Sequence, residues 1–172
     1  DDAVRAVSIV TPDFAHREPV ECAAAAGKHI LIEKPLASTT ADAEAMRDAV
    51  RSAGIRCMVD FHNRWNPAFI EARRSVESGD IGVPVHAYLR FHDTLSVPTE
   101  MLSWAAESSI LWFLGSHSVD LVRWVFGDEV QSVYCAACSS VLKGMGIDTP
   151  DVFCSTVRFR SGALAVIENS WV

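Results

Sequence analysis

The chain has 172 residues, of which 49% are hydrophobic and 22% charged, and its formal net charge is −7 at pH 7. This length allows one or two modest cores, and the composition is typical of a globular protein. The acidic balance without a basic stripe argues against nucleic-acid binding, and no apolar run approaches the ~20 residues of a membrane helix. We therefore expect a cytoplasmic protein with no nucleic-acid and no membrane partner.

The five cysteines predict reduced thiols, because their number is odd in an acidic chain that shows no leader. Cys135 and Cys138 have the spacing of a redox or zinc motif. They fall in a stretch with the pattern of a strand, where residues three apart face opposite sides. No second Cys/His pair lies nearby in sequence, so we predict that Cys135 and Cys138 pack in the core and that there is no metal site.

The first part of the chain alternates strands with helices. Residues 3–10 are a β-branched run that ends at Pro12, which cannot continue a central strand. An alanine-rich helix is predicted over 15–26, with Gly27 as its stop. Residues 30–32 then form a short apolar strand without alternation, as expected where helices cover both faces of a sheet.

A second helix and a third strand follow. Thr39 is an N-cap candidate that forms a capping-box pattern with Asp42. Apolar residues then recur at helical spacing until Gly54. The next strand is predicted over 55–61.

The second part of the chain has a different pattern. A helix opens at Pro67, an alternating strand follows over 83–92, and 93–109 shows no period and predicts a long irregular loop over a cleft. An amphipathic helix is expected over 115–126. Three more strands and one turn complete the chain: strands over 130–140, 152–159 and 163–171, and a turn over 143–151.

These elements predict an α/β protein with two parts. Residues 1–62 would be the second half of a Rossmann-type parallel βα unit, that is, a partial dinucleotide-binding domain. Residues 63–172 would be an α+β domain with an open, mainly antiparallel sheet. Open edges on that sheet would favour association, so we expect a homo-oligomer that forms through it.

The segment Glu33-Lys34-Pro35 interrupts this apolar pattern abruptly. A charged pair is costly at the tip of a buried strand, so its presence suggests a rim that faces a ligand. In a doubly wound sheet, ligands bind at the carboxyl ends of the strands. The alternative for Lys34 is a surface lysine at a strand end. We favour the functional interpretation, and we expect the Lys34–Pro35 bond to be a cis peptide.

Four segments resemble the glucose–fructose oxidoreductase / inositol dehydrogenase (Gfo/Idh/MocA) family. Thr11-Pro12-Asp13-Phe14-Ala15-His16 is similar to its T-P-x-x-x-H turn, and residues 26–35 to its A-G-K-H-x-x-x-E-K-P signature. Residues 61–67 are similar to its crossover segment, and residues 115–120 to its G-x-H-x-x-D helix start. Together, in this order, the four form a specific signal over nearly the whole chain.

The resemblance implies a Rossmann domain followed by an α/β domain with an open sheet, so residues 63–172 would be a partial domain for substrate and oligomerisation. It also implies hydride transfer between NAD or NADP and a hydroxyl or carbonyl of a sugar, polyol or related substrate. The family's Gly-rich phosphate loop would lie before Asp1, and further sheet would follow Val172. We therefore expect that the sequence is a piece of a longer protein, that cofactor binding needs the preceding half, and that the piece alone is inactive.

By this resemblance, Lys34, His117 and Asp120 are the catalytic candidates. The ammonium of Lys34 would favour a developing alkoxide, and the imidazole of His117 would take the hydroxyl proton. Many members of the family carry an aspartate four residues before this histidine, where this chain has Phe113. Either Asp120 substitutes, or Lys34 alone does the acid–base work, or the protein is not a standard dehydrogenase. By residue type alone, His117 would be a cap or a packing residue.

The candidates for cofactor binding are Thr11, Pro12, Glu33, Lys34, Asn63 and Arg64. Thr11 and Pro12 could equally form an ordinary turn, and Arg64 could equally pair with Glu33 or Asp120. We expect His16 to be structural. Trp104, Trp112 and Phe113 are expected to pack in the core or in loops, with stacking on a sugar as the alternative.

The leading hypothesis is an NAD(P)-dependent oxidoreductase. One alternative is an NAD-dependent relative of the glycosidase type that cleaves glycosidic bonds with no net redox turnover. Another is a non-catalytic member that binds nucleotide or sugar, for which Phe113 is the sequence hint.

Overall fold

Two sheets organise the chain, and each belongs to a unit of its own. The computed structural model describes all 172 residues, and these divide into the units Asp1–Phe61 and His62–Val172. The division falls one residue before the boundary expected from the sequence. No helix is long and apolar enough to cross a membrane.

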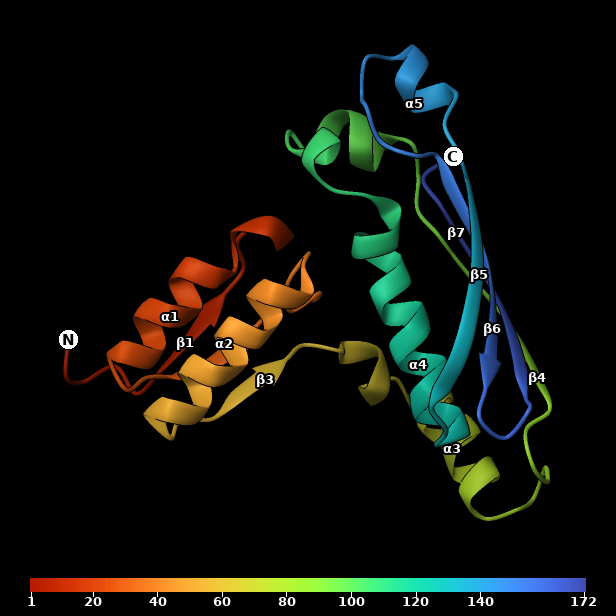
Figure 1. The fold of residues 1–172 in the computed structure, drawn as a ribbon, viewed down its shortest axis with the longest axis horizontal. Coiled ribbons are helices and arrows are strands. Elements are labelled where there is room, and N and C mark those ends of the chain that lie inside the picture. Colours follow the sequence, from red (N-terminus) through yellow and green to blue (C-terminus); the bar gives the residue numbers. More distant parts are fainter. The chain divides into compact units, whose positions relative to one another are not determined.

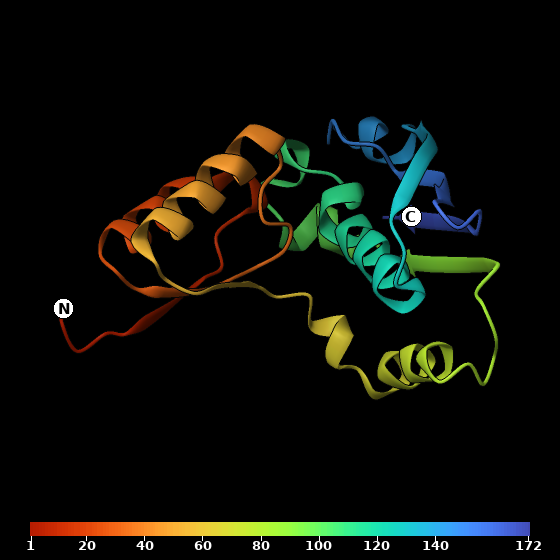
Figure 2. The ribbon, with the colours of Figure 1, turned by 60° about the horizontal axis from the view of Figure 1, so that its bottom comes forward.

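The first unit is a parallel sheet with helices packed on it (Figure 1). The strands lie in the order β1-β2-β3, and each neighbouring pair is parallel. Figure 2 shows the two helices on the same side of these strands. The elements are β1 Ala6–Ile9, η1 Asp13–Ala15, α1 Arg17–Ala25, β2 His29–Ile32, α2 Thr40–Ala53 and β3 Cys57–Val59.

Only one face of this sheet is covered, so the expectation of two covered faces for 30–32 is wrong. Ile30 and Ile32 are buried, whereas Leu31 is 42% exposed. Met58 on the neighbouring strand is also exposed. Both helices follow the same side of the sheet, and the core forms there. The core residues are Ile9, Val20, Ile30, Ile32 and Met46.

Helix α2 begins and ends at the capping residues that the sequence predicts. The backbone N–H of Asp42 donates to the Thr39 hydroxyl over 3.1 Å, and that hydroxyl donates to the Asp42 carboxylate over 2.7 Å. Gly54 ends the helix in the left-handed region, at φ 65°. The preceding helix, α1, begins two residues later than expected because 13–15 form a 3₁₀ turn.

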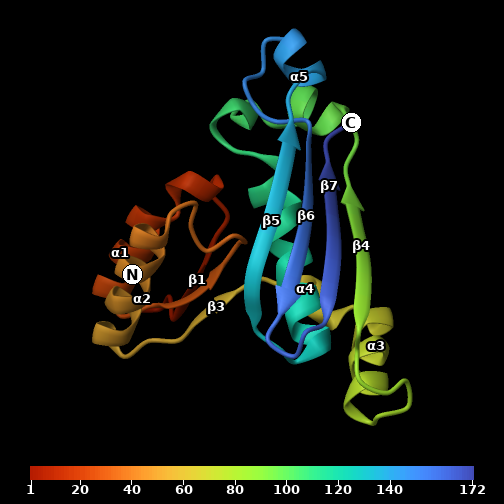
Figure 3. The same cartoon turned by 45° about the vertical axis from the view of Figure 1, so that its right-hand side comes forward.

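The second unit is built around a mixed four-stranded sheet, seen face-on in Figure 3. The strand order is β4-β7-β6-β5, in which β4 and β7 are parallel and the other two pairs antiparallel. Helix α4 lies behind this sheet in that view. The strands are β4 His86–His92, β5 Val130–Cys138, β6 Val152–Phe159 and β7 Leu164–Ser170.

The helices of the second unit include several short turns. Two of them, η3 and η4, fall in 93–109, so the expectation of a wholly irregular segment is wrong there. Similarly, α5 lies at the start of the expected turn 143–151. The helical elements are η2 His62–Trp65, α3 Pro67–Glu77, η3 Val97–Met101, η4 Ala105–Glu107, η5 Leu111–Gly115, α4 Ser116–Phe126 and α5 Val141–Gly144.

Helix α4 is attached to the sheet by apolar packing and by one buried polar contact. Val122 packs on Val157 and Ile167 of the sheet. The Asn169 amide, 1% exposed, donates to the Ser118 hydroxyl over 2.9 Å. A Cβ on Gly115 would stand 3.1 Å from the Asn169 carboxamide oxygen and closer still to Leu111, so a glycine permits this close approach.

The prediction that Cys135 and Cys138 pack in the core is wrong, because both are exposed. Cys22 and Cys154 are exposed as well, and Cys57 is partly buried. Of the three in the second unit, Cys135 and Cys138 lie on β5, the edge strand of the sheet, and Cys154 lies on the neighbouring strand β6. Strand β5 is accordingly exposed along nearly its whole length.

Asp151 closes the loop that carries α5. Its carboxylate, 3% exposed, accepts from the backbone N–H groups of Ser140, Val141 and Leu142 over 2.6–2.8 Å. Burial alone would raise the pKa of this carboxyl, but the three N–H groups favour its ionised form and hold its pKa below the usual value.

We predict that Asp151→Asn lowers the free energy of unfolding by about 1–3 kcal/mol at pH 7, because buried donors lose a charged acceptor. The folded pKa lies below the unfolded value of about 3.9, so this stabilisation is complete above that value and is lost as pH falls through the folded pKa. Urea unfolding at several pH values measures it, with exposed Asp148→Asn as the control. A constant difference between Asp151→Asn and wild type down to acid pH would contradict the prediction.

Candidate functional site

Parallel pairing brings two predicted groups of site residues to one edge of the first sheet. In the register of β1 and β2, Ile9 stands opposite Ile32, and the N–H of Glu33 donates to the carbonyl of Ile9 over 3.0 Å. The segments that follow the two strands therefore leave the sheet at the same edge. Thr11 and Pro12 follow β1, and Glu33 and Lys34 follow β2.

The turn after β2 has the backbone geometry that its sequence predicts. The Lys34–Pro35 bond is cis, which confirms that expectation. Pro35 is buried, whereas Glu33 and Lys34 are half-buried. The backbone N–H of Lys34 donates to the Glu33 carboxylate over 3.3 Å. This carboxylate therefore lies beside the backbone of the turn, and the ammonium of Lys34 sits on a long flexible stem.

The buried ring of His16 contacts the backbone of both segments at this edge. Its ring is 1% exposed, and Nε2 lies 3.0 Å from the carbonyl oxygen of Thr11. Nδ1 lies 2.9 Å from the carbonyl of Pro35 and 3.2 Å from that of Leu36. One imidazole thus joins the turn after β1 to the turn after β2, which confirms the structural role expected for it.

The second unit brings together two other predicted residues. The Arg64 guanidinium, on η2, donates from Nε to Asp120 Oδ2 over 2.8 Å and from Nη2 to Asp120 Oδ1. Asp120 is 8% exposed, and its hydrogen bonds raise the pKa of Arg64. This arrangement is the Arg64–Asp120 pairing that the sequence left open as an alternative. It attaches η2 to the first half of α4.

His117 lies in the first turn of α4 and is 4% exposed. Its ring meets that of His62 edge-to-face, with centroids 4.6 Å apart and planes at 71°. Sequence analysis did not single out His62. Its only sequence signal is its place beside Asn63 in the crossover segment, and the contact depends on tertiary folding.

Phe113 belongs to an apolar cluster. Its ring is 5.0 Å from that of Trp171, in a cluster with Val97, Ile110 and Leu142. This confirms the expected packing role for Phe113. Of the two tryptophans considered with it, Trp112 is 37% exposed and Trp104 is half-buried.

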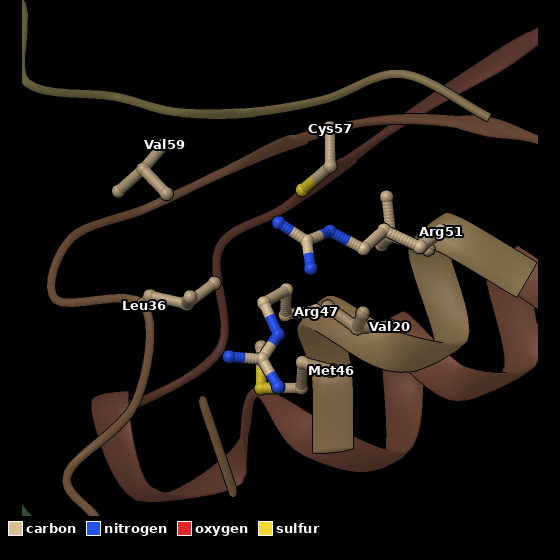
Figure 4. A pocket seen from close by; sticks show the side chains of 8 residues that line it. Val20, Leu36, Met46, Arg47, Arg51, Cys57 and Val59 are labelled. Atoms are coloured by element: carbon tan, nitrogen blue, oxygen red, sulfur yellow. The ribbon is translucent and has the colours of Figure 1, made fainter. Parts of the chain in front are cut away.

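A separate pocket of about 220 Å³ opens beside α2 in the first unit (Figure 4). Its floor is part of the apolar core, including Val20 and Met46. The side chains of Arg47 and Arg51 extend across it from α2. Arg47 is already paired with Asp48 over 2.8 Å. The pocket contains none of the predicted site residues.

Two family descriptions together account for nearly the whole sequence. "Oxidoreductase family, NAD-binding Rossmann fold" matches residues 1–61, and "GFO/IDH/MocA C-terminal domain" matches residues 69–172. The chain belongs to the Gfo/Idh/MocA family. This confirms the resemblance drawn from the four segments, and the parallel sheet followed by a mixed sheet confirms the expected α/β fold.

Among the relatives of the chain are dehydrogenases of sugars and polyols. It is 33% identical to levoglucosan dehydrogenase of Pseudarthrobacter phenanthrenivorans, with 98% of this chain and 50% of that protein covered. It is 32% identical to scyllo-inositol 2-dehydrogenase (NAD⁺) of Bacillus subtilis, with 99% and 49% covered. The structure of aldose-aldose oxidoreductase from Caulobacter crescentus, complexed with glycerol, superposes with a TM-score of 0.89 at 31% identity over 98% of this chain and 51% of that one. The chain thus spans about half the length of these Gfo/Idh/MocA proteins.

We predict that Asp120→Asn lowers the free energy of unfolding by about 1–2 kcal/mol. The loss should be smaller than for a fully buried pair, because the Arg64 side chain is 41% exposed. A double-mutant cycle with Arg64→Met, followed by urea unfolding, measures the coupling between the two. The exposed pair Arg74–Glu71 serves as the matched control, with an expected coupling of at most about 0.5 kcal/mol. Equal coupling in both pairs would mean that the Arg64–Asp120 pair does not stabilise the unit.

Proposed function

We propose that this protein is an NAD(P)-dependent oxidoreductase that transfers a hydride between a nicotinamide cofactor and a sugar, polyol or related hydroxyl or carbonyl substrate. The observation that carries the proposal is the Glu33-Lys34-Pro35 turn, placed at the carboxyl edge of a parallel sheet and braced there by His16. The names of the two dehydrogenase relatives support it. They do not favour a glycosidase or a non-catalytic binding protein.

The carboxyl edge of the first sheet suits a dinucleotide. Such edges bind nucleotide cofactors in doubly wound folds, and this one presents the polar groups of Thr11, Glu33 and Lys34. We assign these three and Pro12 to the cofactor in this proposal. The cofactor, when bound, supplies the site that accepts or donates the hydride. No G-x-G-x-x-G segment occurs in the 172 residues, so we expect them to bind NAD(H) or NADP(H) weakly by themselves.

Lys34 and His117 are the residues that we propose for the chemical step. Lys34 would stabilise charge, and His117 would transfer a proton. Lys34 is half-buried, and its ammonium can donate to a substrate oxygen and stabilise negative charge that develops on it. The His117 imidazole can accept the hydroxyl proton, because histidine changes charge near neutral pH. These two roles are complementary.

Asp120 and the η2 residues have supporting roles in this proposal. Both carboxylate oxygens of Asp120 accept hydrogen bonds from Arg64, so we assign Asp120 to positioning rather than to proton transfer. This choice differs from the catalytic role expected for Asp120 from the sequence. Arg64 is likewise held in the pair, which leaves Asn63 as the better η2 candidate for contact with the nicotinamide amide.

We predict that Lys34→Ala and His117→Ala each lower kcat by about 10²- to 10⁴-fold. The first variant removes the group that stabilises charge on the substrate oxygen, and the second removes the group that accepts the proton. The assay follows NAD(P)H absorbance with a panel of polyols and sugars, in the complete gene product that contains this sequence. The double variant tests whether the two act on one reaction, since groups that act as a unit give non-additive losses.

Calorimetry of NAD(H) and NADP(H) binding accompanies this assay and separates cofactor loss from loss of chemistry. The matched control is Lys28→Ala, a lysine at the amino end of the same strand whose ammonium donates to the Asp1 carbonyl over 3.1 Å. Normal kcat in both alanine variants, together with intact cofactor binding, would reject the assigned roles. Absence of cofactor binding in the complete gene product would reject the proposed function.

We also propose that the protein forms a homo-oligomer through the open face of its second sheet. Helix α4 covers one face, and the other face carries Tyr88, Tyr134 and Leu164, which are 57%, 74% and 41% exposed. Exposed tyrosine and leucine side chains on one face of a sheet are typical of an association surface. Near the end of β7, the Tyr88 hydroxyl donates to Glu168 over 2.8 Å, which adds a polar group to this face.

We predict that Tyr134→Asp weakens self-association at least about tenfold, because it places a charge in the apolar part of that face. Sedimentation velocity over a range of concentrations measures this. Ile81→Asp, an exposed apolar residue in a loop outside the sheet, is the control. Mass at the monomer value at every concentration of wild-type protein would contradict the proposed oligomer.

We propose the cytoplasm as the place where the protein works. The acidic composition and the five thiols, of which four are exposed, support a reducing compartment.

A further inference from the structure

Two imidazole rings from different elements meet in the second unit. His62 comes from the 3₁₀ turn η2, and His117 from the first turn of α4. Their centroids are 4.6 Å apart and their planes are inclined by 71°. His117 is buried and His62 is exposed, so an exposed ring on η2 contacts a buried ring on α4. Edge-to-face contact is a favoured geometry for aromatic rings, and it fixes the tilt of one ring against the other.

A second contact joins the two elements that carry His62 and His117. Arg64 lies two residues after His62, and Asp120 lies three residues after His117, on the same face of the helix. The Arg64–Asp120 ion pair therefore forms a second rung between the same two elements. A short 3₁₀ turn has poor hydrogen-bond geometry of its own, so contacts with α4 determine where its side chains stand.

The neighbours of His117 along its own helix do not offer a free carboxylate. Four residues earlier, the apolar ring of Phe113 packs against Trp171. Three residues later, both oxygens of Asp120 accept from Arg64. Each of these two neighbours is therefore engaged in a contact of its own. The contact with His62 comes from another element and joins the two rings edge-to-face.

We propose that His62 is a positioning residue for His117. The proposal rests on the proposed function, in which the His117 imidazole accepts the substrate's hydroxyl proton. The ring of His62 restricts the tilt of that imidazole and so keeps its nitrogen aimed for proton transfer. A misaligned base lowers the rate of transfer and changes substrate affinity little. Because His62 acts through ring packing and exchanges no proton, another flat ring of similar size can replace it.

The kinetic test compares His62→Leu with His62→Phe in the complete gene product. Leucine removes the aromatic ring at similar volume, and kcat should fall about tenfold with KM nearly unchanged. Phenylalanine keeps a flat ring and should restore kcat to within about threefold of wild type. His29→Ala is the histidine control, since His29 is an exposed residue at the start of β2 whose ring accepts from the Arg56 N–H over 3.1 Å.

A spectroscopic test needs neither substrate nor cofactor. Two-bond ¹H–¹⁵N spectra of the six histidines report ring environment and tautomer, and His117→Gln assigns the His117 signals. We expect that His62→Leu shifts the His117 ring signals and broadens them by exchange, whereas His62→Phe keeps them narrow. Urea unfolding of each variant checks that it folds, and His62→Gln replaces the leucine variant if that one does not.

Two results would overturn the positioning role. One is an unchanged kcat together with unchanged His117 ring signals in His62→Leu. The other is an equal loss of kcat in His62→Phe and His62→Leu, which would assign chemistry to the imidazole of His62 itself. If wild-type protein turns over no substrate and binds no cofactor, the proposed function fails, while the spectra still decide whether His62 orients His117.

Discussion

The parallel register of β1 and β2 is the constraint on which the candidate chemistry of the first unit depends. With Ile9 opposite Ile32, both strands end at one edge, and the segments after them must leave the sheet together. The backbone carbonyls of these two segments then stand near enough for a single buried imidazole, that of His16, to reach both. An apolar side chain, or one with a single polar atom, could not bind the carbonyls of both segments. The backbone of the charged turn at Lys34 is thus held in place by the His16 imidazole.

The second unit uses buried polar contacts in a comparable way around α4. Ser118 attaches the helix to the sheet through Asn169, and Asp120 attaches η2 to the helix through Arg64. Each contact is directional, whereas apolar packing alone would tolerate a helix rotated by a fraction of a turn. His117 directly precedes Ser118 and lies three residues before Asp120 in sequence. Its backbone is therefore fixed on two sides of the helix, and the orientation of its ring is a matter of local packing.

Much of the fold could be predicted from the sequence because the signals are local. The Thr39–Asp42 cap, the glycine at 54 and the cis bond before Pro35 each depend on residues adjacent in the chain. The errors concern solvent exposure. An apolar triplet such as 30–32 indicates a strand but not how many of its faces are covered, and cysteine has no side-chain pattern that separates an edge strand from a core strand.

The candidate site could be predicted only in part. Single residues such as Lys34 and His117 stand out by type and by their neighbours in sequence. Pairings between distant residues do not, and Arg64 and Asp120 are 56 positions apart. His62 has no distinguishing neighbour pattern, and its contact arises only when the crossover segment packs on α4. Long-range contacts of this kind depend on the whole tertiary fold, so composition and spacing do not specify them.

The cysteines of strands β5 and β6 lie on both faces of the second sheet. Side chains alternate along a strand, and the pairing with β6 places Cys138 and Cys154 on the open face and Cys135 on the opposite one. All three thiols are exposed. Anything that covers the open face would slow alkylation of the first two and leave the third as an internal reference. The molecule therefore carries a native reporter of which side of this sheet is in contact with something else.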